Sequence, residues 1–135
     1  MIWQERVLVF LLRFSGALML LAFGAIFLPV DWMAATHRWL GLGDFPVAPI
    51  VDYLTRSISA LYGVYGGLCI LVAGNVRRYA PVIFYLIVMG LVFGVLMLGI
   101  DFYAGLPTYW SAGEGPLIIG TSLVLLLLLR SVPRE

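Results

Sequence analysis

The chain has 135 residues, of which 63% are apolar and 11% are charged, and its formal net charge is +1. A soluble domain usually has about 25% charged residues, so this composition excludes a soluble globule of this size. The balanced charge argues against a nucleic-acid surface, and the single cysteine, Cys69, excludes an intrachain disulfide framework.

Four long apolar stretches predict four transmembrane helices. A helix rises about 1.5 Å per residue, so roughly 20 residues cross the hydrocarbon core of a bilayer. The stretches do not alternate between apolar and polar residues, which excludes barrel strands. We therefore predict an all-α membrane protein, a four-transmembrane-helix bundle forming one membrane domain over residues 1–135. Its spans should cover about residues 7–30, 50–74, 80–101 and 115–131.

The first span contains Arg13, and we expect it to be retained in the mature protein. Arg13 interrupts the apolar region that a signal peptide needs, and no A-x-A cleavage site follows at the right distance. The Arg13 side chain can extend to the inner headgroups, or it can meet an anionic lipid or a group on another subunit. The sequence leaves these alternatives open.

The first outer segment predicts an amphipathic helix over about residues 31–41. Asp31 is suited to begin this helix and Gly41 to end it. At about 100° per residue, Trp32 and Trp39 share one arc, and His37 lies on the opposite side. This pattern is typical of a helix that lies in the membrane interface with its tryptophans at headgroup depth. A helix packed over the end of the bundle is the alternative.

The other two connections differ in character. Gly74 suits a helix end and Pro81 a helix start, so the inner connection should be a tight turn that makes spans two and three antiparallel neighbours. The second outer connection, residues 102–114, is expected to be an aromatic loop. Pro116 is then expected in the first turn of the fourth span.

The arginines predict the orientation in the membrane. All eight basic residues are arginine, and most of them lie near the two termini and the inner turn, whereas most acids lie on the other side. The positive-inside rule then places both termini in the cytoplasm. We expect a multi-pass protein of the bacterial inner (cytoplasmic) membrane. The expected membrane anchors are Arg77 and Arg78 on the inside and Trp32, Trp39 and Trp110 on the outside.

The sequence contains few groups that could perform chemistry. One histidine and one cysteine cannot supply the four ligands of a structural zinc site within one chain. Neither a phosphate-binding loop nor a nucleophile elbow is present. We therefore predict no catalytic residues, no metal and no nucleic-acid partner, which favours a role other than that of an enzyme.

Polar residues of the outer side form the candidate ligand site. Asp52 and Arg56 are four residues apart, within ion-pair reach on one helix face. They are either a self-neutralising pair or part of the polar mouth of a cleft that could hold a lipid or a quinone. The predicted cleft residues are His37, Asp52, Arg56, Asp101, Tyr103 and Glu114.

Glycine pairs predict where helices approach closely. Gly63 and Gly67 in the second span, like Gly90 and Gly94 in the third, have the spacing that lets helix backbones touch. The pairs serve packing inside the bundle, or they form a surface for another subunit or a second copy.

The order of these features resembles the DoxX-like family of small four-helix membrane proteins. The resemblance covers roughly residues 11–90. It depends on Arg13-Phe14-Ser15-Gly16 and Gly24, on Trp39-Leu40-Gly41-Leu42-Gly43 followed by Pro46 and Pro49, on the glycine-rich residues 66–74, and on Arg77-Arg78-Tyr79-Ala80-Pro81. It implies a four-helix fold, and an association with quinone-linked or thiol-linked redox systems, as some members have.

Two functions follow as hypotheses. The first is a non-catalytic subunit or scaffold of a membrane assembly, with membrane lipids and either further copies of the chain or other membrane subunits as partners. The second is a DoxX-like, redox-associated module with a quinone or lipid cleft at the outer (periplasmic) interface.

Overall fold

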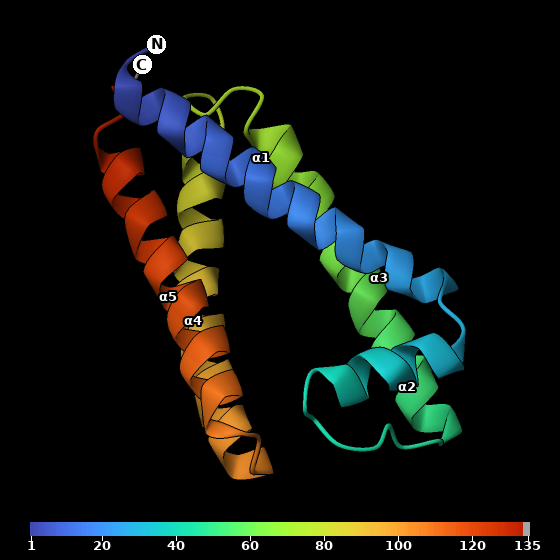
Figure 1. Cartoon of the computed structure of the whole chain (residues 1–135). Coiled ribbons are helices and arrows are strands. Elements are labelled where there is room, and N and C mark those ends of the chain that lie inside the picture. Colours follow the sequence, from blue (N-terminus) through green and yellow to red (C-terminus); the bar gives the residue numbers. More distant parts are fainter. Residues whose placement is uncertain (134–135) are drawn as a thin grey trace. The chain divides into compact units, whose positions relative to one another are not determined.

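The structure is a computed structural model that describes residues 1–133, and those residues form helices and connecting segments without any strand (Figure 1). The α-helices are α1 (Trp3–Phe23), α2 (Val30–Trp39), α3 (Pro49–Val72), α4 (Ala80–Ala104) and α5 (Thr108–Arg130), and a short 3-10 helix, η1 (Gly24–Phe27), follows α1. Four segments are long and apolar enough to cross a membrane: α1 together with η1, α3, α4 and α5. The predicted class, an all-α membrane protein with four transmembrane helices, is confirmed.

The chain divides into two compact units. One, the α4–α5 unit, combines Met1–Leu12 with the chain from Leu71 onward, and the other, the α1–α3 unit, is Arg13–Ile70. The boundary falls inside α1, at Arg13.

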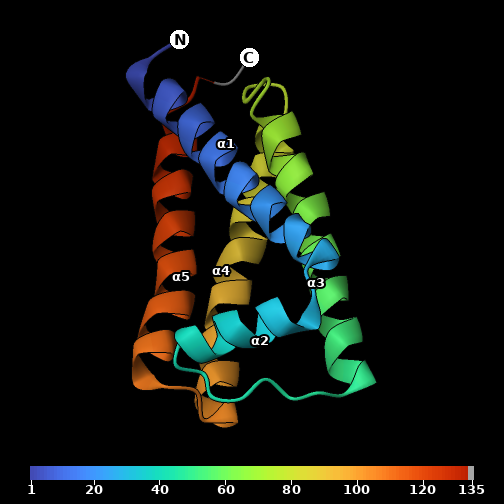
Figure 2. The same cartoon turned by 45° about the vertical axis from the view of Figure 1, so that its right-hand side comes forward.

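The α4–α5 unit is built on an antiparallel helix hairpin (Figure 2). Gly105 ends α4 in the left-handed conformation, with φ of 71°, which glycine adopts without steric cost. The backbone N–H of Leu106 then donates to the Asp101 carbonyl over 3.0 Å. Only three residues, 105–107, separate the two helices, so α4 and α5 must run side by side.

Glycines bring the two helices of the hairpin close together. A methyl group at Gly94 would lie 2.7 Å from Cγ1 of Ile119, and one at Gly115 would lie 2.9 Å from Cβ of Leu98. Gly90 lies against the Ser122 hydroxyl in the same way. This seam of small residues allows the van der Waals contact that stabilises helix pairs in lipid.

The hydrophobic core of the α4–α5 unit lies at the other end of the hairpin. The first turns of α1 pack there against the segment between α3 and α4. The largest buried apolar side chains of this core include Leu8, Leu12, Val72, Ile83 and Leu125.

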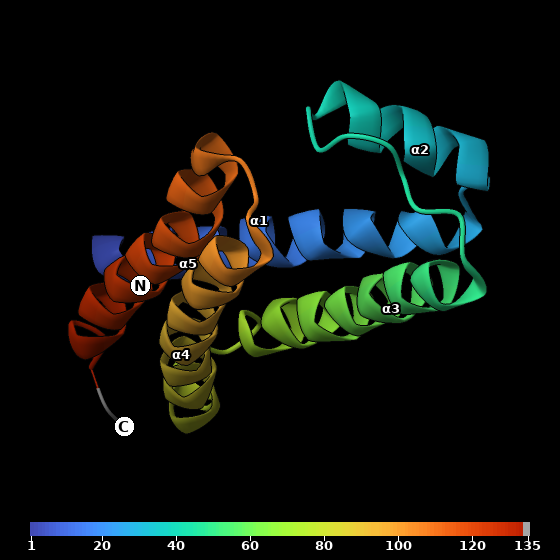
Figure 3. The ribbon, with the colours of Figure 1, turned by 90° about the horizontal axis from the view of Figure 1, so that it is seen from below.

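The α1–α3 unit is a second close helix pair (Figure 3). A methyl group at Gly66 of α3 would lie 2.6 Å from the Gly16 carbonyl oxygen of α1, so the two backbones touch at this crossing. Gly63 accommodates the Phe23 ring one turn away. Met33 is the buried residue of α2.

The helix boundaries differ from those expected at several points. The fourth spanning helix begins at Thr108, so the expected loop shrinks to residues 105–107, and Pro116 lies inside α5. The prediction that Pro116 occupies the first turn was wrong. The residues before Pro116 are helical, but they are too polar for hydropathy to assign them to a transmembrane span. The first helix begins at Trp3 instead of residue 7.

The short helix α2 runs Val30–Trp39, close to the expected 31–41. Pro29 precedes it as the cap residue without a side-chain hydrogen bond, so Asp31 is not the cap and lies in the first turn, where a negative charge is favourable. Gly41, with φ of 76°, takes the left-handed conformation just after the helix, as expected.

Candidate functional site

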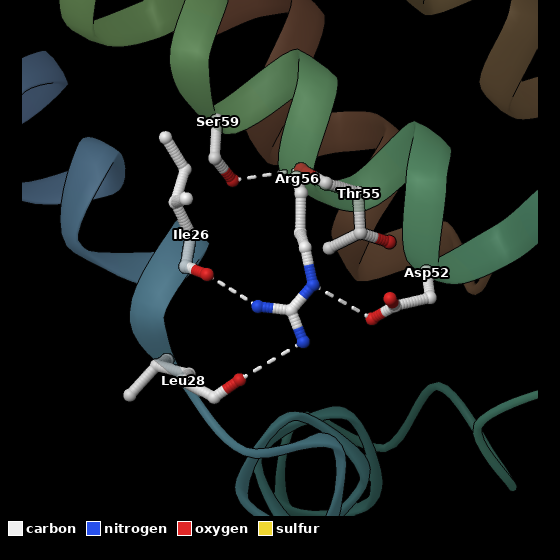
Figure 4. Close-up of polar contacts among 6 residues, drawn as sticks. All are labelled: Ile26, Leu28, Asp52, Thr55, Arg56 and Ser59. Carbon is white, nitrogen blue, oxygen red and sulfur yellow. Dashed lines mark hydrogen bonds and ion pairs between the residues drawn. The ribbon is translucent and has the colours of Figure 1, made fainter.

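Arg56 is the centre of a polar cluster in the α1–α3 unit (Figure 4). Its Nε donates to Oδ1 of Asp52 over 2.9 Å, which confirms that the two residues are within ion-pair reach. Its Nη1 donates to the Ile26 carbonyl, and its Nη2 donates to the Leu28 carbonyl over 3.2 Å. All three guanidinium nitrogens therefore bind acceptors within the chain.

These contacts arise because the first spanning segment ends just before α2. The last carbonyls of a helix have no partner in their own helix, and burial without one is costly. Arg56 lies in α3 one turn after Asp52 and reaches back to the η1 carbonyls. Its guanidinium thereby fastens the end of the first span to α3.

Ser59 continues this face of α3 without joining the cluster. Its hydroxyl donates to the Thr55 carbonyl of its own helix over 2.8 Å. The buried hydroxyl is thus satisfied locally, a common arrangement for serine in helices.

His37 lies at the exposed end of α2 and organises the segment that follows. Its Nδ1 lies 3.0 Å from the Gly43 carbonyl oxygen, and its ring meets the Phe45 ring edge to face, with centroids 5.6 Å apart. An ion pair over 3.6 Å between the exposed Arg38 and Asp44 supports the same turn.

Asp101 and Ser111 form the most unusual polar feature of the α4–α5 unit. Each residue is 1% exposed, although both are polar. Neither the two carboxylate oxygens of Asp101 nor the hydroxyl of Ser111 has a hydrogen-bond partner among residues 1–133. Buried polar groups are nearly always paired, so an unpaired acid and hydroxyl at one end of the hairpin require a physical explanation.

Two other predicted cleft residues, Tyr103 and Glu114, lie near the same end of the hairpin and differ from Asp101 in their surroundings. Tyr103 is 95% exposed. Glu114 accepts a hydrogen bond of 2.8 Å from the Trp110 indole nitrogen. Trp110 is therefore held by a contact inside the chain in addition to its predicted role as an anchor.

The six residues predicted to line one outer cleft divide between the two units. His37, Asp52 and Arg56 belong to the α1–α3 unit, and Asp101, Tyr103 and Glu114 belong to the α4–α5 unit. A cleft that joins all six stays a prediction.

The predicted packing glycines separate into two kinds. Gly63, Gly90 and Gly94 each meet side chains of the neighbouring helix within their own unit. Gly67 differs from these three. Apart from the nearby backbone of α3 itself, a methyl group at Gly67 would have no heavy atom of its own unit within 4 Å. Three of the four glycines therefore serve packing inside the chain.

Two features escaped the sequence-based reasoning. Ser111 was assigned to a loop, where a buried hydroxyl is not expected. Glu5, only 5% exposed, receives two hydrogen bonds from Arg77, with Nε to Oε1 at 3.1 Å and Nη2 to Oε2 at 3.0 Å. Arg77 thus forms a structural ion pair, whereas the neighbouring Arg78 is exposed and its guanidinium lies 5.7 Å from the Tyr79 ring centroid.

The remaining predicted anchors lie on the surface of the α1–α3 unit. Trp32 and Trp39 are both exposed, while Met33 between them is buried. Such an arrangement suits tryptophans that face lipid headgroups.

No protein-family model, curated protein or solved structure matches this chain. The resemblance to the DoxX-like family therefore stays a prediction.

Proposed function

We propose that this chain is a non-catalytic subunit of a membrane assembly, located in a bacterial cytoplasmic membrane with both termini in the cytoplasm. The observation that favours this role is the set of contacts made by Arg56. Its nitrogens donate to Asp52 and to the carbonyls of Ile26 and Leu28. Arg56, the arginine of the predicted cleft, therefore makes contacts that stabilise the fold. An arginine used in this way stabilises a scaffold more readily than it binds a substrate.

A second observation indicates where a partner helix would bind. Residues of α1 occupy the space beside Gly63 and Gly66 of α3, but a methyl group at the neighbouring Gly67 would meet no atom of the α1–α3 unit within 4 Å. Val64 and Leu71, one turn before and after Gly67 on this face, are exposed. A small residue between larger exposed ones offers a notch for the ridge of another transmembrane helix.

The arginine distribution supports the proposed orientation. Arg6, Arg77, Arg78 and Arg130 belong to the segments predicted to face the cytoplasm, whereas Arg38 and Arg56 belong to the opposite side. An excess of arginine in short loops and ends is the feature that sets orientation in the membrane.

Native mass spectrometry of the protein extracted in mild detergent tests the proposal, because it reports partners, copy number and bound small molecules together. We expect the wild type to carry a second copy or another membrane protein in fixed stoichiometry. The Gly67→Leu variant should fold but lose that partner. Gly66→Leu is the matched variant at the closed neighbouring position, and it should impair folding itself.

The alternative, a redox-associated quinone or lipid cleft, predicts a different result. A monomeric wild type that retains a quinone or a lipid would overturn the subunit proposal and favour the cleft. If a folded Gly67→Leu variant retains the partner, the partner does not bind at the α3 surface around Gly67. His37→Ala should leave assembly unchanged, since the contacts that the His37 side chain makes among residues 1–133 are with its sequence neighbours Gly43 and Phe45.

A further inference from the structure

The turn end of the α4–α5 hairpin contains two buried polar groups without partners. Asp101 and Ser111 are each 1% exposed. Both oxygens of the Asp101 carboxylate and the Ser111 hydroxyl oxygen lack a hydrogen-bond partner among residues 1–133. Few buried side-chain atoms are left in this state, and each one requires a physical explanation.

The register of the hairpin places these two residues at the same level. Gly90 meets Ser122, and Leu98 meets Gly115. The next step along the seam moves three residues forward in α4 and four residues back in α5, and it arrives at Asp101 and Ser111. Both residues lie five positions from Leu106 in the connecting turn, so the register places them in one layer between the helices.

Burial of the Asp101 carboxylate favours a bound positive charge. Asp101 lies in the last turn of α4, whose dipole disfavours a carboxylate, but Ser111 lies in the first turn of α5, whose dipole has the opposite sign, so the two helix ends oppose each other. A buried ionised carboxylate without a partner is strongly unfavourable. A bound cation would remove this penalty.

The chemistry of the donors narrows the choice of cation. Every unpartnered donor is an oxygen atom, which suits hard cations. One carboxylate balances one positive charge, whereas calcium sites combine several carboxylates. The other titratable side chains at this end of the hairpin are Tyr103, which is exposed, Tyr109, and Glu114, which is bonded to Trp110.

We propose that Asp101 and Ser111 form a binding site for a sodium ion, and that occupancy stabilises the α4–α5 hairpin. The carboxylate of Asp101 takes up the cation, and the Ser111 hydroxyl oxygen supplies a second contact. This site is independent of the subunit role proposed above, because it lies inside one hairpin of one chain.

The test compares thermal unfolding of the full chain in mild detergent in sodium chloride and in choline chloride of equal ionic strength. Infrared spectra in the carboxyl region are recorded on the same samples. We expect the unfolding temperature to rise by about 3–6 °C at saturating sodium, with a sodium-dependent shift of a carboxylate band.

Three variants assign the effect to this site. In Asp101→Asn the sodium response should disappear, and in choline this variant should unfold at or above the wild-type temperature, because it has no charge to bury. Ser111→Ala should raise the sodium concentration of half-maximal effect several-fold. Asp44→Asn, which alters an acid in an exposed loop, should behave as the wild type.

A wild-type protein that shows no sodium response would overturn the proposal. So would a sodium response that persists in Asp101→Asn. If Asp101→Asn does not fold, the wild-type comparison and Ser111→Ala decide the question. A response to calcium or magnesium instead of sodium would also contradict a monovalent site.

Discussion

Arg77 donates two hydrogen bonds to Glu5, a residue 72 positions earlier in the chain, with both nitrogen–oxygen distances near 3 Å. The pair joins the first turn of α1 to the segment between α3 and α4. The Glu5 side chain is 6% exposed and that of Arg77 is 33% exposed, so the pair is largely shielded from water. Two parallel hydrogen bonds between a guanidinium and a carboxylate are stronger and more specific than one contact between point charges.

Breaking this pair should destabilise the α4–α5 unit. We expect Glu5→Gln to lower the free energy of unfolding by about 1–3 kcal/mol, because Arg77 would keep its charge in a half-buried place without its partner. Arg77→Lys should lose about 1 kcal/mol, since an ammonium group cannot form both bonds at once. The measurement is unfolding in mixed micelles with increasing denaturing detergent.

Arg78 supplies the matched control for this prediction. It is adjacent to Arg77 but exposed, so Arg78→Gln should change the free energy of unfolding by less than about 0.5 kcal/mol. Equal losses in the Arg77 and Arg78 variants would mean that net charge at this end matters more than the pair.

The glycines of α5 should respond to substitution in opposite ways. A methyl group at Gly115 would lie 2.9 Å from the Gly94 carbonyl oxygen, and backbone cannot move aside easily. We expect Gly115→Ala to cost about 1–3 kcal/mol of unfolding free energy through overpacking. Gly113→Ala, where nothing lies within 4 Å, should be neutral or stabilise by up to about 1 kcal/mol, since alanine is the better helix former. A tolerated Gly115→Ala would show that the hairpin seam is looser than these distances imply.

The fold class was predictable because lipid imposes a simple rule on sequence. Apolar stretches of spanning length can satisfy their backbone only as helices, so four stretches give four helices. The boundaries were less accurate where polar residues continue a helix beyond the apolar core. The first turns of α5 include Ser111 and Glu114, and hydropathy alone assigns such residues to a loop.

The candidate sites were predictable only where partners are close in sequence. The spacing of Asp52 and Arg56 predicts their ion pair, but the carbonyls of Ile26 and Leu28 lie 30 and 28 residues away and leave no trace in residue type. The bonds between Glu5 and Arg77 depend equally on tertiary packing. Gly66 and Gly67 are the same residue type in adjacent positions of one helix. The position of α1 decides that Gly66 is packed against another helix and that Gly67 is not.

The proposed orientation predicts which loops can be labelled from outside the cell. Cys69 is buried and is replaced by alanine to give a background without cysteine. In intact cells, a membrane-impermeant thiol reagent should label Asp44→Cys, in the segment after α2, but should label Arg78→Cys only after the membrane is opened. The reverse pattern would overturn the orientation, whereas labelling of both in intact cells would contradict the four-span topology.

Arg56 and Asp52 should differ in their importance for stability, although they form one ion pair. Arg56 also binds the carbonyls of Ile26 and Leu28, so Arg56→Gln would leave these acceptors without their donor and should lower the free energy of unfolding by about 1–3 kcal/mol. Asp52 is 40% exposed and contacts only one of the guanidinium nitrogens, so Asp52→Asn should cost less than about 1 kcal/mol. Unfolding in mixed micelles measures both values, and the double variant measures their coupling. A larger loss for Asp52→Asn than for Arg56→Gln would mean that the pair itself, and not the attachment of the first span to α3, is what stabilises this end of the helix.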